Sequence, residues 1–313
     1  MRVTVLAGGV GGARFVTGLR GALGADDEIT VVVNTGDDLW LSGVRLQPDI
    51  DSILYALAGV NDTERGWGRA GETERVSAEL QAWGAGWPWF TLGDLDLGTH
   101  LARTGWLREG LTPSQVAERL GARWPIGARL LPMTDAEVDT HVVVEGGDRL
   151  HFQEWWTRHR ASLRAVAFEN PGIGEATPGA GVVEAITGAD VVVMAPSNPV
   201  VSIGPILQVP GIREALGGAR RVVGISPIIG GKVVRGMADA CLAAIGVETA
   251  ADAVARLYGR RAAGGVLDTW LVAEEDAALA PSLAAEGWDV RVQPLWMSDP
   301  ETSAALARAA ITP

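Results

Sequence analysis

Three pairs of carboxylates in the first hundred residues could do chemistry, because each pair lies where a strand is expected to end or a helix to begin. The pairs are Asp37 and Asp38, Asp49 and Asp51, and Asp94 and Asp96. In an open parallel sheet, the loops beyond the carboxyl ends of the strands build the ligand site. Aspartates brought there by several loops would hold a hard divalent cation, most naturally Mg²⁺ bridging phosphates. Each aspartate alone also suits a turn or the first turn of a helix.

A glycine-rich segment could bring phosphates close to the backbone. Residues 8–14 read Gly-Gly-Val-Gly-Gly-Ala-Arg after an expected strand, and a helix is expected to start near Ala13. Glycines there allow a phosphate to approach the free N–H groups of a helix N-terminus, with Gly11 and Gly12 nearest to it. The dinucleotide fingerprint is not met, because Arg14 replaces its third glycine, and no Gly-Lys-Ser/Thr completes a P-loop. A tight turn without a ligand is the alternative.

Two further segments place polar side chains between prolines and glycines after expected strands. Residues 195–205 contain Ser197 and Asn198, and residues 226–232 contain Ser226 and Lys232. These side chains could bind a base or a phosphate, with Lys232 as a phosphate contact, or the segments could be stiffened turns. Trp155 and Trp156 are the tryptophans that we expect to stack on a flat heterocycle, whereas most other tryptophans pack in the core or at its rim.

Composition limits the class of protein. The chain has 313 residues and a net charge of −12, which disfavours nonspecific binding to nucleic acid. The single cysteine excludes a disulfide framework and a cysteine-based zinc site. With only four histidines, the sequence also disfavours a histidine-rich metal site. No apolar run reaches the about 18 residues of a membrane span, and the N-terminus does not read as a signal peptide. We therefore expect a cytoplasmic protein without nucleic-acid or membrane partners.

The elements that must position these residues follow an α/β pattern. Valine- and isoleucine-rich runs predict buried strands at residues 3–6, 29–33, 165–168, 191–194, 222–225 and 266–272. With helices between them, they predict a doubly wound, mostly parallel, Rossmann-like sheet in a single domain over residues 1–313. Residues 60–160 break the rhythm, and we expect a mostly helical insertion that caps the active-site cleft.

Taken together, these segments resemble one family, the 2-phospho-L-lactate transferases of coenzyme F420 biosynthesis. The resemblance rests on residues 6–14, 33–38, 48–55, 92–100, 133–135, 152–155 and 196–205, which follow one another in family order. It implies transfer of a phosphoenolpyruvyl or 2-phospholactyl group from a guanosine diphosphate-activated donor to the ribityl hydroxyl of the deazaflavin Fo. GMP is released and Mg²⁺ is required. The composition resembles that of actinobacterial members, for which phosphoenolpyruvate is the expected transferred group. The resemblance also implies a homodimer.

The resemblance also implies roles for individual residues. Asp49 matches the family's Fo- and metal-site aspartate; Asp49 and Asp51 are the candidate catalytic residues. Asp37, Asp38 and Asp49 are the candidate metal ligands. The candidate substrate-binding residues are Gly11, Gly12, Asp37, Asp49, Asp94, Asp96, Thr99, His100, Trp155, Ser197, Asn198 and Ser226. Leu95 replaces a basic residue that many members have, and Arg103 or Arg14 would have to substitute for it.

Two other functions stay open at the level of sequence. A nucleotide-sugar-binding regulator of the gluconeogenesis-factor type would share the glycine-rich start and the sheet, but Thr99, His100 and residues 152–155 favour the transferase. An NAD(P)-dependent oxidoreductase is disfavoured by Arg14 and by Asn34, which stands where such enzymes carry an acid for the ribose.

Overall fold

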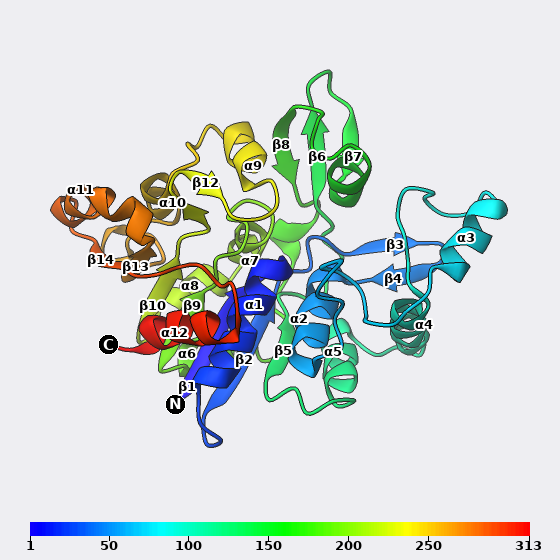
Figure 1. Ribbon diagram of the computed structural model, residues 1–313, viewed down its shortest axis with the longest axis horizontal. Coiled ribbons are helices and arrows are strands. Elements are labelled where there is room, and N and C mark those ends of the chain that lie inside the picture. The colour runs from blue at the N-terminus through cyan, green and yellow to red at the C-terminus, as the bar shows by residue number, and fades with distance from the viewer.

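The computed structural model describes residues 1–313 and is built on a seven-stranded sheet in the order β14-β13-β10-β9-β1-β2-β5 (Figure 1). Its strands are β1 (Arg2–Ala7), β2 (Glu28–Val33), β5 (Arg129–Pro132), β9 (Val191–Met194), β10 (Val222–Ile225), β13 (Thr269–Val272) and β14 (Asp289–Val292). Every neighbouring pair is parallel. The chain runs from β1 to β2 on one side and returns as β9 on the other. The strand order therefore reverses between β1 and β9, which is where such sheets bind ligands.

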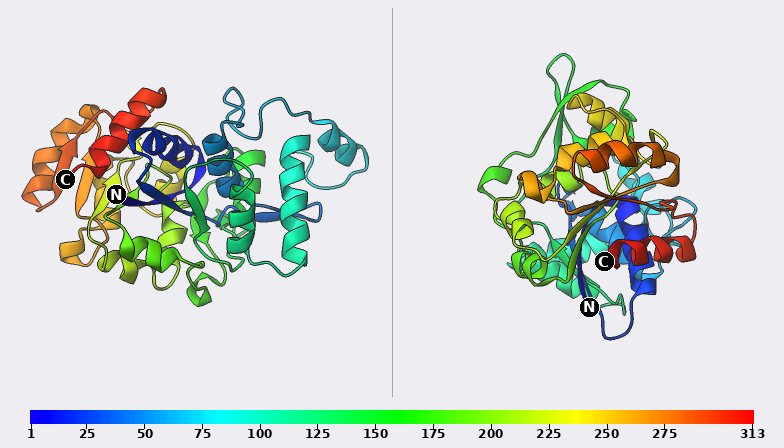
Figure 2. Two further views of the ribbon diagram at one scale, coloured as in Figure 1. Left: turned by 90° about the horizontal axis from the view of Figure 1, so that it is seen from below. Right: turned by 90° about the vertical axis from the view of Figure 1, so that its left-hand side faces the viewer.

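Helices cover both faces of this sheet (Figure 2). One face carries α1 (Gly9–Ala22), α2 (Pro48–Ala58), α5 (Pro113–Gly121) and α12 (Pro300–Ile311). The other carries α6 (Val182–Gly188), α7 (Ile203–Gln208), α8 (Ile212–Gly217), α10 (Ala251–Tyr258) and α11 (Ala280–Ala285). Val31 and Val33 enter one core and Val32 the other. This double burial is why the strands read as continuous apolar runs, and it confirms the doubly wound α/β fold.

Smaller elements extend from the sheet. The hairpin β3 (Leu39–Leu41) and β4 (Val44–Leu46) lies with α3 (Arg75–Ala82) and α4 (Asp94–Arg108) in an arm at one end of the molecule (Figures 1 and 2). A three-stranded antiparallel sheet contains β6 (His141–Val144), β7 (Arg149–His151) and β8 (Ala165–Glu169), next to the π-helix η1 (Glu154–Arg158) and α9 (Ala238–Ala244). A short hairpin joins β11 (Ile228–Ile229) to β12 (Lys232–Val233). Three 3₁₀ segments complete the chain: η2 (Ile173–Glu175), η3 (Arg261–Ala263) and η4 (Glu274–Leu279).

Two expectations about these elements are wrong. Residues 60–160 include α3, α4 and α5 but are not mostly helical, since β5 belongs to the central sheet and β6 and β7 to the antiparallel one. Residues 165–168 form β8 of the antiparallel sheet and not a central strand: β8 pairs only with β6, and of its five residues only Ala165 is buried. A short apolar run does not reveal how many of its faces will be buried.

The expected start of the first helix is also wrong, since α1 begins at Gly9 and not near Ala13. The edge strand β14 is not evident from the sequence, because its charged residues alternate with valines. None of the helices has both the length and the apolar character needed to cross a lipid bilayer.

Candidate active site

A cavity of about 770 Å³ opens at the reversal point of the sheet. Its walls come from the β1–α1 turn, the start of α2, part of α4 and the loops after β9 and β10. Further parts of the wall come from residues 67–68, 89–92, 152–153, 156–157, 233–238 and 295–298. Pockets of this size suit a small-molecule ligand or a pair of them. The β1–α1 and β9 loops are joined at this point by Ser197, whose Oγ donates to the Gly8 carbonyl at 2.7 Å.

The glycines of the first helical turn serve close packing. A side chain at Gly11 would place Cβ 2.8 Å from the Pro196 carbonyl oxygen, and one at Gly12 would place it 2.9 Å from Ala7 Cβ. This close contact with β1 and the β9 loop explains why glycines occupy the helix itself instead of a preceding loop. Gly11 lines the cavity as expected, but Gly12 is buried behind it and does not.

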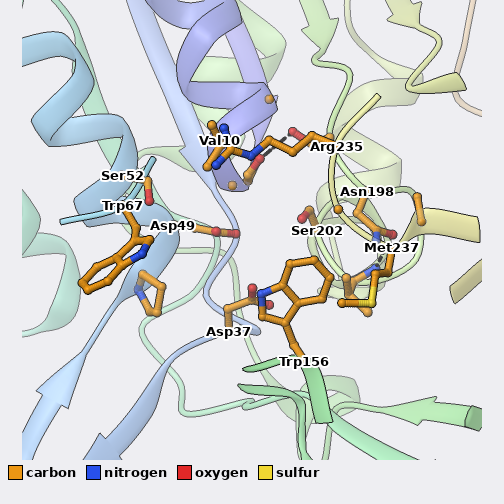
Figure 3. Close-up of a pocket in the computed structure, with 18 of the residues that line it drawn as sticks. Val10, Asp37, Asp49, Ser52, Trp67, Trp156, Asn198, Ser202, Arg235 and Met237 are labelled. Carbon is orange, nitrogen blue, oxygen red and sulfur yellow. Dashed lines mark hydrogen bonds between the residues drawn. The ribbon is translucent and has the colours of Figure 1, made fainter. Parts of the chain in front are cut away.

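Asp37 and Asp49 form the first charged feature of the cavity, and both point into it (Figure 3). They are 8% and 4% exposed. Asn34 Nδ2 joins them, donating to Asp49 Oδ2 at 2.9 Å and lying 3.4 Å from Asp37 Oδ1. Burial raises the pKa of Asp49 to about 6. Burial, and then repulsion by Asp49, raises the pKa of Asp37 well above its usual range.

Neither Asp37 nor Asp49 forms an ion pair with a basic side chain. The neighbouring acids Asp38 and Asp51 do, with Arg45 and Arg103 respectively. Two buried carboxylates with uncompensated charge are costly unless a cation joins them. Carboxylate oxygens are the ligands that Mg²⁺ prefers. The donor set of Asp37 and Asp49 therefore fits a hard divalent cation.

Asp38, the third expected metal ligand, is turned away from this pair. It accepts a hydrogen bond from Gln47 Nε2 at 2.8 Å, and Arg45 Nη2 lies 3.6 Å from it. Arg45 is itself paired with Asp139 at 2.8 Å. Asp38 does not line the cavity, so the expectation that it binds the metal together with Asp37 and Asp49 is wrong.

A second acidic group joins α2 to α4. Asp51 is bound by the buried Arg103, whose Nη1 also lies 3.0 Å from His100 Nδ1. Since an arginine only donates, Nδ1 accepts and the ring proton is on Nε2, 3.4 Å from Asp96 Oδ2. Tyr55 donates to the other Asp96 oxygen at 2.7 Å.

This group lies in the cavity wall, but it differs from the first pair of carboxylates. Asp51, Asp96 and His100 are close enough to share an ion. The Arg103 guanidinium already supplies positive charge among them, and this engagement also excludes Arg103 as a free substrate contact. Asp51 Oδ2 and His100 Nε2 are buried and form no hydrogen bond. Asp51, Asp96 and His100 thus reach the cavity wall as the sequence analysis expected.

Other expected contacts lie outside the cavity. Asp94 accepts from the backbone N–H of Thr73 at 2.9 Å and from its hydroxyl at 2.8 Å, which holds the loop before α3. Thr99 is buried inside α4. Neither side chain lines the cavity, because the start of α4 presents only one face to it and that face carries Asp96 and His100.

The two neighbouring tryptophans have opposite environments. Trp155 is completely buried against Phe152 and Phe168, and its Nε1 donates to the Leu163 carbonyl at 2.7 Å. It therefore cannot stack on a ligand, and that expectation is wrong. Trp156 points into the cavity instead (Figure 3). Neighbouring positions of a helical turn face different directions, which the sequence alone did not resolve.

The polar residues after β9 and β10 line the cavity, but their side chains mainly hold the turns. Ser197 binds the β1–α1 turn, as described above. Asn198 Oδ1 accepts from the Val200 N–H at 2.9 Å, and Ser226 Oγ donates to the Ile228 carbonyl at 2.8 Å. Lys232 is exposed and outside the cavity, so its expected role as a phosphate contact is wrong.

Several cavity residues were missed from the sequence. The guanidinium groups that line the cavity belong to Arg14 and Arg235, of which only Arg14 had been considered. Further aromatic walls come from Trp67, Trp89 and Trp296. Asn34 was read only as evidence against NAD, although its position directly after β2 could have suggested a link to the aspartates. Leu95 is exposed and outside the cavity.

The doubly wound parallel sheet and the cavity at its reversal point define an α/β fold of the kind that binds ligands at this edge of the sheet. Residues 3–301 match the family model described as 2-phospho-L-lactate transferase CofD. The chain therefore belongs to this family of transferases.

Individual relatives agree with this assignment. A protein of Mycolicibacterium smegmatis named phosphoenolpyruvate transferase is 51% identical over 99% of this chain and 98% of its own length. One of the same name from Thermobifida fusca is 52% identical over 99% of this chain and 97% of its own. A crystal structure of a UPF0052-family protein from Bacillus halodurans superposes with a TM-score of 0.63, at 20% identity and full coverage of both chains. That similarity supports the fold alone.

Proposed function

We propose that this protein transfers a phosphoenolpyruvyl group from a guanosine diphosphate-activated donor to the terminal ribityl hydroxyl of Fo. The reaction releases GMP and belongs to coenzyme F420 biosynthesis. The names of relatives about half identical to this chain favour phosphoenolpyruvate over 2-phospholactate as the transferred group. The observation that carries the proposal is the buried pair of Asp37 and Asp49, which lacks a basic partner at the ligand-binding point of the sheet.

Asp37 and Asp49 would hold Mg²⁺, as the fit of their donor set indicates. When bound, the ion neutralises negative charge on the diphosphate of the donor and on the leaving GMP. Asn34 keeps both carboxylates in place through Nδ2. Because Gly8 has no side chain, the Asp49 carboxylate can lie against its backbone. A Cβ at Gly8 would lie only 2.5 Å from Asp49 Oδ2.

The chemical step requires positioning and a proton acceptor more than a protein nucleophile. The hydroxyl oxygen of Fo forms a bond to the phosphorus of the phosphoenolpyruvyl group, the anhydride bond to GMP breaks, and GMP leaves with the electron pair. The hydroxyl proton passes to a carboxylate. Asp51 suits this role because Arg103 engages one of its oxygens while the other is unpaired, and burial raises its pKa.

The aromatic residues of the cavity suit the flat ring system of Fo. Trp156 and Trp67 line the cavity from different segments (Figure 3), and Trp296 contributes a further half-exposed ring. Aromatic faces bind a planar heterocycle by stacking with little loss of side-chain freedom.

The test is a transfer assay with Fo, the activated donor and Mg²⁺. We expect stoichiometric release of GMP and formation of a more acidic deazaflavin product. Chromatography separates the product, and mass spectrometry identifies it. Binding of the guanine nucleotide without turnover would contradict the proposal and favour a regulator.

Asp49→Ala should abolish transfer at saturating Mg²⁺ while the protein stays folded. Asp94→Ala is the matched control, because Asp94 is a nearby aspartate outside the cavity. Normal turnover by a folded Asp49→Ala variant would refute the role of Asp49.

A further inference from the structure

The cavity has an unusual charge distribution for a protein that binds an anionic donor. Four aspartates line it, at positions 37, 49, 51 and 96, and the whole chain carries a net charge of −12. The guanidinium groups in its wall belong to Arg14 and Arg235. A single divalent cation at Asp37 and Asp49 would leave much of a diphosphate's charge uncompensated. The two arginines are therefore the groups to consider.

Arg14 is the weaker candidate of the two. It extends from α1, and its Nη1 lies 3.5 Å from the Met297 carbonyl, at the limit of a hydrogen bond. This contact directs the guanidinium toward residues 295–298 at the rim of the cavity.

Arg235 is free to bind an anion. It follows the β11–β12 hairpin, directly before Gly236, whose φ of +87° is left-handed. Its side chain crosses the cavity toward Val10 in the first turn of α1 (Figure 3). Several arginines, buried and exposed, form ion pairs with carboxylates, for example Arg103 and Arg164, but Arg235 forms none and its side chain is exposed.

The far end of the Arg235 side chain contacts the segment before α3. A side chain at Gly66 would place its Cβ 2.2 Å from Arg235 Nη2, so the guanidinium lies directly against the Gly66 backbone. Gly66 itself is left-handed, with φ +78°. Arg235 therefore spans the mouth of the cavity between two segments that are far apart in the sequence, and it passes over the N-terminus of α1.

We propose that Arg235 binds the diphosphate of the activated donor and distinguishes it from uncharged nucleosides. The inference rests on the proposed function for the identity of the donor. The planar guanidinium can form two parallel hydrogen bonds to phosphate oxygens, which an ammonium group cannot. The N-terminus of α1, toward which Arg235 extends (Figure 3), would favour the same anion through its helix dipole.

The experiment measures binding of GDP and of guanosine by isothermal titration calorimetry in Mg²⁺. We compare wild type with Arg235→Ala and Arg235→Lys. Lys232→Ala is the matched control, because it removes a positive charge from the same hairpin but outside the cavity. Arg235→Ala should weaken GDP binding about tenfold or more, Arg235→Lys should weaken it less, and guanosine binding should not change. Circular dichroism verifies that each variant is folded.

Several outcomes would overturn the inference. These are equal GDP affinity in wild type and Arg235→Ala, an equal loss for GDP and guanosine, an equal loss in Lys232→Ala, or no GDP binding by the wild type. In steady-state transfer, Arg235→Ala should raise the KM for the donor but not for Fo. GDP binding that depends on Arg235 in a protein inactive toward Fo would support the role of Arg235 and contradict the proposed function. The two failures are therefore distinguishable.

Discussion

At the residue scale, the environment of each carboxylate decides its role. Asp37 and Asp49 share an amide donor and no base, Asp38 is held by Arg45 and Gln47, and Asp51 is held by Arg103. The six aspartates have the same side-chain chemistry. Asp37 and Asp49 fit a divalent cation best, because no guanidinium compensates their charge, whereas Arg45 and Arg103 already pair with Asp38 and Asp51.

Asp49→Asn should stabilise the metal-free protein at pH 7.5. Burial raises the pKa of Asp49 to about 6 from its ordinary 3.8. Between about pH 4 and 6 the folded state keeps a proton that the unfolded chain loses, so stability falls as pH rises through this window and the cost persists above it. The variant removes a cost on the order of 1–3 kcal/mol.

Urea unfolding with a chelator at pH 7.5 and pH 5 measures this effect. The gain of Asp49→Asn should be present at pH 7.5 and shrink at pH 5, where wild-type Asp49 is protonated. Added Mg²⁺ should stabilise wild type but not the variant, since the carboxylate pair is then broken. A variant less stable than wild type at pH 7.5 would contradict the uncompensated charge.

Trp155 and Trp156 should respond differently to truncation. Trp155→Ala should cost about 3–5 kcal/mol of folding free energy, because it empties a fully buried site. Trp156→Ala should change stability little and weaken Fo binding, because its ring faces the cavity. Urea unfolding and Fo titration give the two readouts. Weakened Fo binding by Trp155→Ala at full stability would reverse the assignment.

At the element scale, the first turn of α1 depends on close contact with its neighbours. A Cβ at Gly12 would lie 2.9 Å from Ala7 Cβ and 3.0 Å from Ser197 Oγ, whereas a Cβ at Gly21 in the same helix meets nothing within 4 Å. Packing therefore requires a glycine at position 12 but not at position 21 of the same helix.

Gly12→Ala should destabilise the protein by about 1–3 kcal/mol through overpacking. Gly21→Ala should stabilise it by about 0.5–1 kcal/mol, because alanine is the better helix former at an open position. Chemical denaturation of both variants gives the comparison. Equal effects of the two substitutions would show that packing against β1 is not what selects glycine at position 12.

At the scale of the whole molecule, the two ends of the chain meet on one face of the sheet. α12 packs along α1, where a Cβ at Gly18 would lie 2.4 Å from the Ser303 backbone (Figure 1). Its Leu306, Ala307 and Ala310 belong to the core on that face. α1 and α12 therefore pack into the same hydrophobic core.

Deletion of residues 300–313 should prevent cooperative folding, since it exposes this apolar face of α1 and removes several buried side chains. Thermal unfolding by circular dichroism and binding of a hydrophobic dye measure the loss. A truncated protein that unfolds cooperatively at the wild-type midpoint would show that α12 is dispensable for the core.

The sequence predicted some elements well and others poorly for identifiable reasons. Buried central strands such as β2 and β9 carry long valine runs that only a doubly covered sheet explains. β8 is also an apolar run, but the number of its covered faces depends on what packs there. The start of α1 was misplaced because glycines usually interrupt a helix, whereas here the contact with Pro196 requires one in it.

The sequence by itself determined the α/β class, the family and the positions of the acids near the ends of the strands, because these depend on residue type and local periodicity. Only the tertiary structure decided which acids act together. Asn34 donates a hydrogen bond to Asp49, Arg103 pairs with Asp51, and Arg235 contacts Gly66 from a distant part of the chain. Burial and charge pairing come from such distant segments, and they determine which side chains can bind a cation or an anion.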